Sequence, residues 1–202
     1  MTDMIIGQHT ISLPFKGART YIQGPDLVNA ALAPFENPNV LQAKFSVHGF
    51  ISHPNCLMTI TDVEPEKSNR PFLGQVTVES AKYWVEIVED NDNKTPETRV
   101  DFDERRVTDH CTIAGETITL FCPPPFSLIE TIVSMKKHLM ETLISPGDMK
   151  WIFTVVDYKK TTCEIDRLSI EIKHNFQCKL TKSNIVANGE TIGTLYFSLV
   201  KP

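Results

Sequence analysis

The cysteines and histidines are the side chains that most often carry metal or redox chemistry, and their spacing excludes the common local motifs. The five cysteines lie at least eleven residues apart, so the chain has no CxxC redox pair and no zinc knuckle. The six histidines form no HxxxH or HExxH pair, the spacing that places two metal ligands on one face of a helix. We therefore expect reduced thiols, no metal site and no cofactor.

Two acidic residues lie where helices are expected to begin. Glu130 follows Ser127 by three positions, the spacing of a capping box, and Asp26 directly follows Pro25, a residue favoured in a first helical turn. A carboxylate at such a position either stabilises the helix dipole or acts as an acid or base toward a bound substrate. Both interpretations stay open, and we take Glu130 and Asp26 as candidate catalytic residues.

A polar segment, residues 19–29, surrounds Asp26. It is polar where a buried turn would favour apolar residues, which makes it a candidate substrate-binding site formed by Arg19, Tyr21, Gln23 and Asn29. In the turn before Glu130, the nearest residue with a reactive side chain is Cys122, which precedes three prolines. We interpret Cys122 as a small buried apolar group, since a reactive thiol needs an electropositive setting.

One long amphipathic helix is predicted over residues 127–144. Its apolar residues recur at spacings of three and four, and prolines before it and Ser-Pro-Gly after it limit its length. Lys136 falls inside the apolar arc, so we expect its side chain to snorkel or to meet a partner surface.

Strands are predicted for most of the remaining chain. Segments rich in Val, Ile, Phe and Thr predict strands at 10–15, 40–51, 56–63, 72–79 and 83–88 in the first half and at 150–158, 168–176, 184–187 and 190–200 in the second. Asn188-Gly189 is the dipeptide most suited to a tight hairpin turn. In the first half, 24–26 predicts a helix start and 27–33 a short apolar helix.

The two halves follow one plan, a strand, a helix and then about four antiparallel strands. Ile11-Ser-Leu13 and Ile118-Thr-Leu120 precede the two helices with an offset of 107 residues. We expect α+β units at 1–90 and 107–202, joined by a solvated acidic connector at 91–106. A single α+β domain without duplication is the alternative.

The composition and net charge of the chain disfavour nucleic acid and membranes as partners. The chain has 202 residues, 41% of them hydrophobic and 22% charged, and a formal net charge of −5, so it offers no general basic field for nucleic acid or anionic membranes. No apolar run is long enough for a membrane span, and the first residues lack the features of a secretory signal. We expect a cytoplasmic protein.

Residues 124–130 resemble a segment of the hydroxyacyl-carrier-protein dehydratases, written P-G-V-L-x-x-E, in which a proline turn leads into the central helix and a carboxylate follows. Glu130 takes the place of that carboxylate, and Pro125 replaces the glycine. Together with the repeated plan, this resemblance implies a tandem, or double, hotdog fold: two units, each an antiparallel sheet wrapped around a central helix, paired as a pseudo-dimer in one chain.

The family's dehydratases use a histidine base in the turn before the helix and a carboxylate acid on the partner helix. Here Glu116 stands at the position that this spacing would give to the histidine. The resemblance extends to acyl thioesterases, which use an acid near a helix to activate water or attack the thioester, as Asp26 or Glu130 could do. Arg19 or Lys136 could pair with the phosphate of phosphopantetheine.

The resemblance therefore implies a protein of fatty acid metabolism that binds or processes an acyl-CoA or acyl-carrier-protein thioester, thioesterase-like or dehydratase-like. The alternatives are a non-catalytic acyl-binding or protein-interaction module and a structural subunit without a ligand. Two units in one chain can pair internally, so both a monomer and a homodimer agree with the sequence.

Overall fold

The computed structural model describes residues 6–35, 40–66, 70–92, 97–123, 125–145, 147–160 and 164–201. The chain divides into two units, Met1–Phe102 and Asp103–Pro202, each with a set of antiparallel strands and a helix. The division falls within the predicted connector 91–106, of which residues 93–96 lie outside the described residues, as does Pro124 of the dehydratase-like segment.

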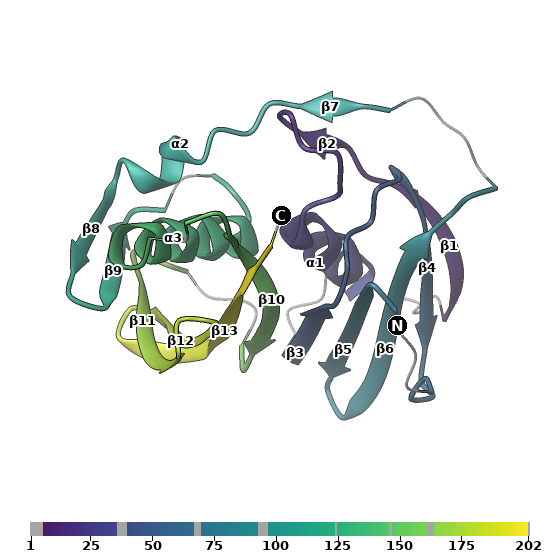
Figure 1. Ribbon diagram of the computed structural model, residues 1–202. Helices are drawn as coiled ribbons and strands as arrows, with labels where there is room; N and C mark the ends of the chain where they lie inside the picture. The colour runs from purple at the N-terminus through teal and green to yellow at the C-terminus, as the bar shows by residue number, and fades with distance from the viewer. Residues whose placement is uncertain are drawn as a thin grey trace. The chain divides into compact units, whose positions relative to one another are not determined.

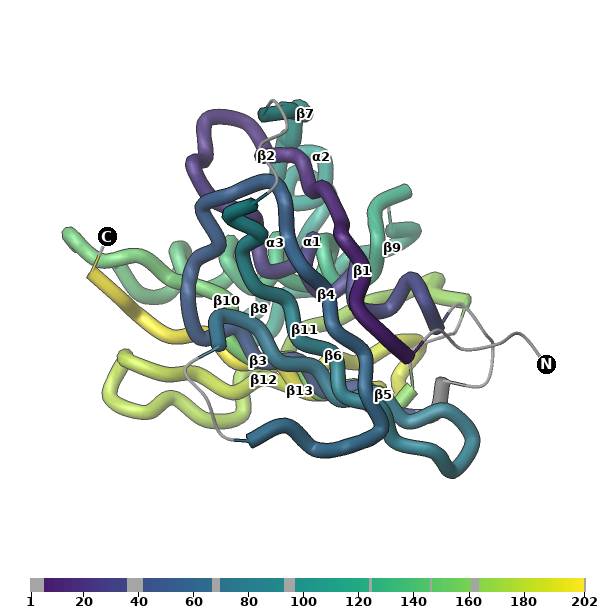
Figure 2. Tube along the Cα trace, turned by 90° about the vertical axis from the view of Figure 1, so that its right-hand side faces the viewer, coloured from purple at the N-terminus to yellow at the C-terminus, as the bar shows by residue number. Residues whose placement is uncertain are grey.

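Unit 1 is an antiparallel sheet with one α-helix beside it (Figure 1). Helix α1 spans Gly24–Leu32, with a proline in its first turn, and a 3₁₀ turn follows at Ala33–Phe35. The sheet strands are β1 (Gly7–Ser12), β3 (Val40–Val47), β4 (Asn55–Thr61), β5 (Phe72–Val78) and β6 (Ala81–Glu89). Their order is β1-β4-β6-β5-β3, and the tube in Figure 2 shows β1, β4 and β6 side by side.

The core of unit 1 is formed where α1 contacts β5 and β6. Leu27, Val28 and Ala31 are buried on the helix. On the sheet, the stacked rings of Phe45 and Phe72 have centroids 5.9 Å apart. Gly74 makes room for them, because a Cβ at this position would lie 2.6 Å from the ring of Phe45.

Unit 2 repeats this arrangement with a longer helix (Figure 1). Helix α3 spans Leu128–Leu143, and a short helix, α2, spans Arg105–Thr108. The strands are β8 (Cys111–Ala114), β9 (Thr117–Phe121), β10 (Lys150–Tyr158), β11 (Arg167–Phe176), β12 (Leu180–Ala187) and β13 (Glu190–Val200). Within the unit their order is β10-β13-β12-β11-β9-β8, all antiparallel.

Helix α3 confirms the predicted central helix almost to the residue. It begins at the N-cap Ser127 and ends before Ile144, and it contacts β9, β10 and β11. Its apolar stripe is buried against the sheet, at Ile129, Ile132, Met135, Leu139 and Met140. Burial of this stripe, more than helix propensity, stabilises the helix.

The predicted hairpin at Asn188-Gly189 is also confirmed. Both residues have positive φ values, 51° and 88°, as a turn of the type I′ family requires. The Asn188 side-chain oxygen accepts hydrogen bonds from the backbone N–H groups of Asp166 and Arg167, each at 3.0 Å. The turn that joins β12 to β13 is therefore also tied to the start of β11.

Two predictions in the first half need correction. The predicted strand at 10–15 is wrong as one element, because the chain forms β1 and then a separate short strand, β2 (Phe15–Lys16), after Pro14, which has no N–H to donate. The predicted connector is not wholly irregular. It contains β7 (Arg99–Val100), which pairs in parallel with β2, and the start of helix α2.

Candidate functional site

The entrance of helix α1 holds a nearly buried ion pair. Lys16 Nζ on β2 lies 2.5 Å from Asp26 Oδ1 in the first turn of α1, and the two side chains are 8% and 12% exposed. The ammonium group also lies 4.7 Å from the centroid of the Phe102 ring. Asp26 is therefore held at the positive end of the helix dipole beside a cation.

Lys16 could not be predicted from the sequence as the partner of Asp26. The two residues are ten apart, on a strand and a helix separated by a loop, so neither helical nor strand periodicity relates them. Only the pairing of β2 with β7 fixes where Lys16 lies.

The polar segment before α1 is ordered by arginine side chains. With the Gln23 amide oriented as its neighbours favour, its oxygen accepts hydrogen bonds from Nε and Nη1 of Arg19 at 2.7 and 2.9 Å. Arg99 Nη1 donates to the backbone oxygens of Gly17 and Arg19 at 3.0 and 2.9 Å. The structure thus brings Arg19 and Gln23 together, and fixes the loop from β7.

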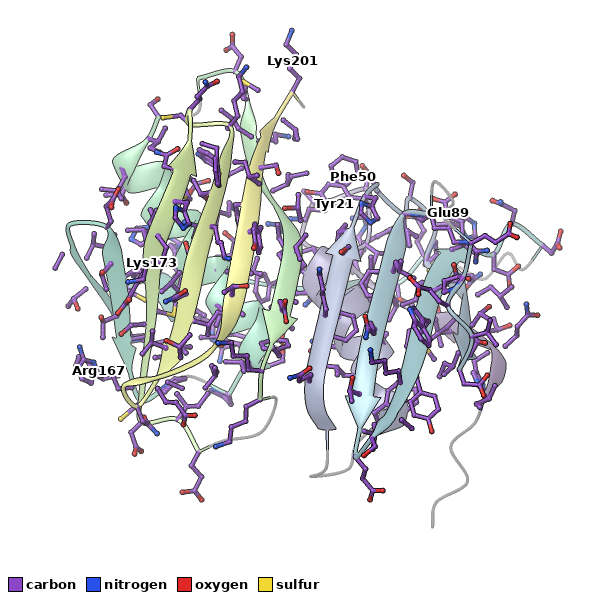
Figure 3. The ribbon with its side chains drawn as sticks, turned by 90° about the horizontal axis from the view of Figure 1, so that it is seen from below. Tyr21, Phe50, Glu89, Arg167, Lys173 and Lys201 are labelled. Atoms are coloured by element: carbon purple, nitrogen blue, oxygen red, sulfur yellow. The ribbon has the colours of Figure 1, made fainter. Side chains whose placement is uncertain are left out.

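The other two candidate binding residues of unit 1 lie apart from this pair. Tyr21 packs against Phe50 with ring centroids 4.7 Å apart, and Figure 3 shows the two residues side by side near one end of the sheet. Phe50 is 55% exposed, so the pair presents an aromatic surface. Asn29 is partly exposed on α1, three residues after Asp26 and so near it on the helix surface.

At the entrance of helix α3, Glu130 forms a complete capping box. Its Oε2 accepts hydrogen bonds from the backbone N–H of Ser127 at 3.0 Å and from the Ser127 hydroxyl at 2.6 Å. The backbone N–H of Glu130 in turn donates to Ser127 Oγ at 3.3 Å. This geometry gives Glu130 a structural role, and its catalytic role stays a prediction.

An open pocket of about 500 Å³ lies near this entrance, lined by Arg106, His110, Phe121 and Cys122. Cys122 is exposed, so the interpretation of this residue as a small buried group is wrong. The reason is the backbone: Cys122 leaves β9 with φ of 50°, and its N–H donates to the Asp166 oxygen at 2.9 Å. This turn leaves the thiol at the surface.

Two arginine side chains lie over aromatic rings beside the pocket. The guanidinium of Arg106 lies 5.0 Å from the centroid of the Phe126 ring, and that of Arg167 lies 5.6 Å from the Phe121 ring. Arg167 begins β11 and is labelled in Figure 3. Phe121 keeps 58% of its surface exposed. The pocket therefore combines positive charge with apolar surface, a combination that suits a ligand with an anionic part and an apolar part.

The sequence did not point to His110 as a site residue. It lies between α2 and β8, twelve residues before Cys122, whereas the dehydratase motif has its histidine in the turn directly before the central helix. No spacing rule relates His110 to Cys122. The two line one pocket because β8 pairs with β9, which brings the start of β8 to the end of β9.

Lys136 lies inside unit 2, and the prediction that it snorkels is wrong. Its side chain is fully buried on α3, and among the described residues Nζ has no hydrogen-bond partner. Burial lowers the pKa of Lys136 from 10.5 to about 7, against a smaller opposing effect of the Glu116 charge. A buried Nζ does not reach a phosphate in solvent, so we leave Lys136 out of the proposed binding residues.

Metal ligands do not gather in the described parts of the chain, where no group of three or more His, Cys, Asp or Glu side chains could hold an ion. Within the same ranges, no helix has the length and apolar character needed to cross a membrane.

Comparison with known proteins relates the chain to solved structures only. No protein-family model matches the sequence, and no curated protein matches it. The solved structures that align over nearly the whole chain include a tesB protein, a thioesterase and a dehydratase domain. The tesB protein of Mycobacterium avium subsp. paratuberculosis is 9% identical, with a TM-score of 0.55 and coverage of 97% of this chain and 93% of that one.

The other two are a thioesterase and a dehydratase. An acyl-ACP thioesterase from Bacteroides thetaiotaomicron is 9% identical, with a TM-score of 0.51 and coverage of 96% and 97%. The dehydratase domain from the CurJ module of curacin polyketide synthase is 8% identical, with a TM-score of 0.51 and coverage of 100% and 95%. The chain has a hotdog-type fold. At these identities the likeness shows the fold, and function must be argued from the site.

Proposed function

We propose that the chain processes acyl thioesters, carried by CoA or by an acyl carrier protein, and that it is built as two hotdog units at 1–90 and 107–202 that pair as an internal pseudo-dimer. The observation that carries the proposal is the pocket beside the α3 entrance, where Arg106 and His110 adjoin the exposed ring of Phe121. A CoA or phosphopantetheine thioester combines phosphate with an apolar acyl chain, which this lining matches. The likeness in fold to thioesterases and a dehydratase supports the same class of substrate.

In unit 1 we propose Asp26 as the acid or base of the reaction. Hydrolysis of a thioester needs a group that takes a proton from water or attacks the carbonyl carbon itself, and a carboxylate at a helix N-terminus can do either. Backbone N–H groups of the first helical turn can polarise the carbonyl oxygen. Lys16 positions Asp26 through the 2.5 Å ion pair.

We propose Arg19, Tyr21, Gln23 and Asn29 as substrate-binding residues of unit 1. Arg19 is the cation for a phosphate, and the aromatic surface of Tyr21 and Phe50 is suited to apolar parts of the ligand. In unit 2, Glu130 is the corresponding acid. For Glu130 to act, its Oε2 must exchange the Ser127 hydrogen bonds for the substrate.

Dehydration of a hydroxyacyl thioester is the second candidate reaction, and the position of His110 favours it. Dehydration removes an α-proton and protonates the departing hydroxyl group, so it needs both a base and an acid. An imidazole in the pocket can supply the base that the turn before α3 lacks.

Both reactions are tested with purified full-length protein and acyl-CoA substrates of increasing chain length. Free CoA measured by chromatography reports hydrolysis, and enoyl-CoA formed from 3-hydroxyacyl-CoA reports dehydration. We expect Asp26→Asn and Glu130→Gln to reduce turnover at least about a hundredfold where the residue acts as the general acid or base.

Exposed acids serve as matched controls: Asp101→Asn for unit 1 and Glu141→Gln on α3. Neither change should alter turnover. Turnover that is unaffected by both Asp26→Asn and Glu130→Gln removes the proposed catalytic residues, and absence of both turnover and acyl-CoA binding removes the proposed function.

A further inference from the structure

The thiols in the described part of the chain fall into two kinds. Cys56 and Cys111 are inert, because burial raises the pKa of Cys56 to about 12 and that of Cys111 to about 11. Cys122 and Cys178 are exposed and free of disulfides. Since a reagent or substrate must reach the sulfur, the exposed pair are the candidates for reaction among the described cysteines.

The two exposed thiols, Cys122 and Cys178, differ in their surroundings. Cys178 lies in the turn between β11 and β12, where its backbone N–H donates to Asn175 Oδ1 at 2.9 Å. Cys122 lines the 500 Å³ pocket together with Arg106 and His110. A positive charge stabilises a thiolate, and an imidazole can take up the thiol proton, as in enzymes that use a Cys-His pair.

Charged residues of both signs lie around Cys122 and His110. The acid closest in sequence to His110 is Asp109, and Asp166 contributes its backbone oxygen to the Cys122 N–H. Arg106 and Arg167 lie over Phe126 and Phe121, which hold both guanidinium groups beside the turn. The pocket is lined by Arg106, His110, Phe121 and Cys122, and no acid is among the described lining residues.

We propose that Cys122 accepts the acyl group of the substrate and forms a covalent S-acyl intermediate. This inference rests on the proposed function, because the acyl donor is a thioester. His110 takes the proton from the Cys122 thiol, and the sulfur attacks the carbonyl carbon. A new carbon–sulfur bond forms, the carbon–sulfur bond to CoA breaks, and His110 returns the proton to the departing CoA thiolate.

One thioester replaces another in this step, so no oxidant, reductant or further reactant is needed. Phe121, exposed beside Cys122, offers apolar surface to the acyl chain, and Arg106 offers a charge to the phosphates of the donor. Water then hydrolyses the S-acyl group and regenerates the thiol.

The first test detects the intermediate by mass spectrometry of the intact protein. Wild type is mixed with octanoyl-CoA, quenched in acid after milliseconds to seconds, and digested to locate the adduct. We expect a mass increase of one octanoyl group on Cys122 that neutral hydroxylamine removes, as it removes thioesters but not amides. The adduct should persist in Cys178→Ser, the matched control, and be lost in Cys122→Ser.

The second test measures CoA release, which can be detected even when the S-acyl intermediate is too short-lived to accumulate. Release should fall in Cys122→Ser and in His110→Gln, and stay at the wild-type rate in Cys178→Ser. Circular dichroism shows whether each variant is folded. Reaction with iodoacetate adds a measure without substrate: Cys122 should be alkylated faster than Cys178, because the Arg106 charge in the pocket attracts the anionic reagent.

The outcomes separate this inference from the proposed function. CoA release that continues unchanged in folded Cys122→Ser overturns the S-acyl intermediate and leaves acyl-thioester processing in place. Binding of acyl-CoA without any CoA release, and without an adduct, also overturns the S-acyl intermediate, and leaves recognition of the thioester without its hydrolysis. A chain that neither binds nor cleaves acyl-CoA overturns the proposed function and the intermediate together.

Discussion

Replacing Lys136 with methionine should stabilise the protein at neutral pH. The fully buried ammonium group has a pKa of about 7 in the folded chain, against 10.5 for an ordinary lysine. A difference of this size corresponds to about 5 kcal/mol of unfavourable burial of the charged form, at about 1.4 kcal/mol per pKa unit. Methionine matches the unbranched stem and carries no charge, so Lys136→Met removes this cost.

The pH dependence gives a sharper test than the stability alone. Below pH 7 both the folded and the unfolded chain bind the Lys136 proton and the full cost applies, whereas above pH 10.5 neither binds it and the cost vanishes. Between these limits the unfolded state binds more protons, so the free energy of unfolding rises with pH. From pH 7 to pH 9 it should rise by about 2 kcal/mol more in wild type than in Lys136→Met.

Urea unfolding at both pH values measures these quantities. Fluorescence of Trp151, in a Trp84→Phe background, reports on unit 2, since the chain has two tryptophans and Trp84 lies in unit 1. Lys137→Met is the matched control: its Nζ pairs with Glu104 at 2.7 Å and its side chain is 31% exposed, so it should show no comparable slope. A Lys136→Met protein that is less stable at pH 7, or that keeps the wild-type slope, refutes the assignment of Lys136 as an unpaired buried amine.

Three further predictions concern the core, the helix start and the thiols. Gly74→Ala should lower the free energy of unfolding by about 1–3 kcal/mol, because the new Cβ meets the Phe45 ring at 2.6 Å. Ser127→Ala should lower it by about 1 kcal/mol through loss of the α3 capping box. In native protein at pH 8, Cys56 and Cys111 should resist alkylation until urea unfolds the chain, since burial raises both pKa values to about 12 and about 11.

Each of these predictions has a control within the chain. Gly49→Ala should be tolerated, because its Cβ would lie in ordinary contact, 3.6 Å from Pro71. Ser145→Ala, beyond the end of α3, should leave stability unchanged. Exposed Cys178 should react in the native protein. Equal losses of unfolding free energy in Gly74→Ala and Gly49→Ala, or in Ser127→Ala and Ser145→Ala, would show that the Phe45 contact or the capping box does not determine stability. Rapid alkylation of Cys56 in the native protein would show that burial does not protect this thiol.

Local patterns predicted the elements that depend on local physics. The apolar stripe and the serine cap located α3, and the positive φ values suited to Asn188-Gly189 located the last hairpin. The same rules failed where pairing at long range decides the outcome. Pro14 divides a strand that its apolar neighbours favour, and Arg99, in a polar segment, joins a strand because β2 offers it a partner.

The candidate site shows the same division. The two acids at the helix starts were predictable, because helix termini favour carboxylates irrespective of the rest of the fold. Their partners were not, since Lys16 reaches Asp26 from a different strand. His110 and Cys122 share a pocket only through the pairing of β8 with β9. The burial of Lys136 could not be predicted for a different reason. A lysine within an apolar arc ordinarily extends its flexible side chain to solvent.

The central claim, that the chain recognises acyl thioesters, is tested most directly by calorimetric titration with a thioether analogue of octanoyl-CoA, which cannot be hydrolysed. We expect saturable binding of one acyl chain per site, weaker binding of free CoA, and loss of affinity in Arg106→Gln. No heat of binding for the analogue, with the protein folded by circular dichroism, would contradict it.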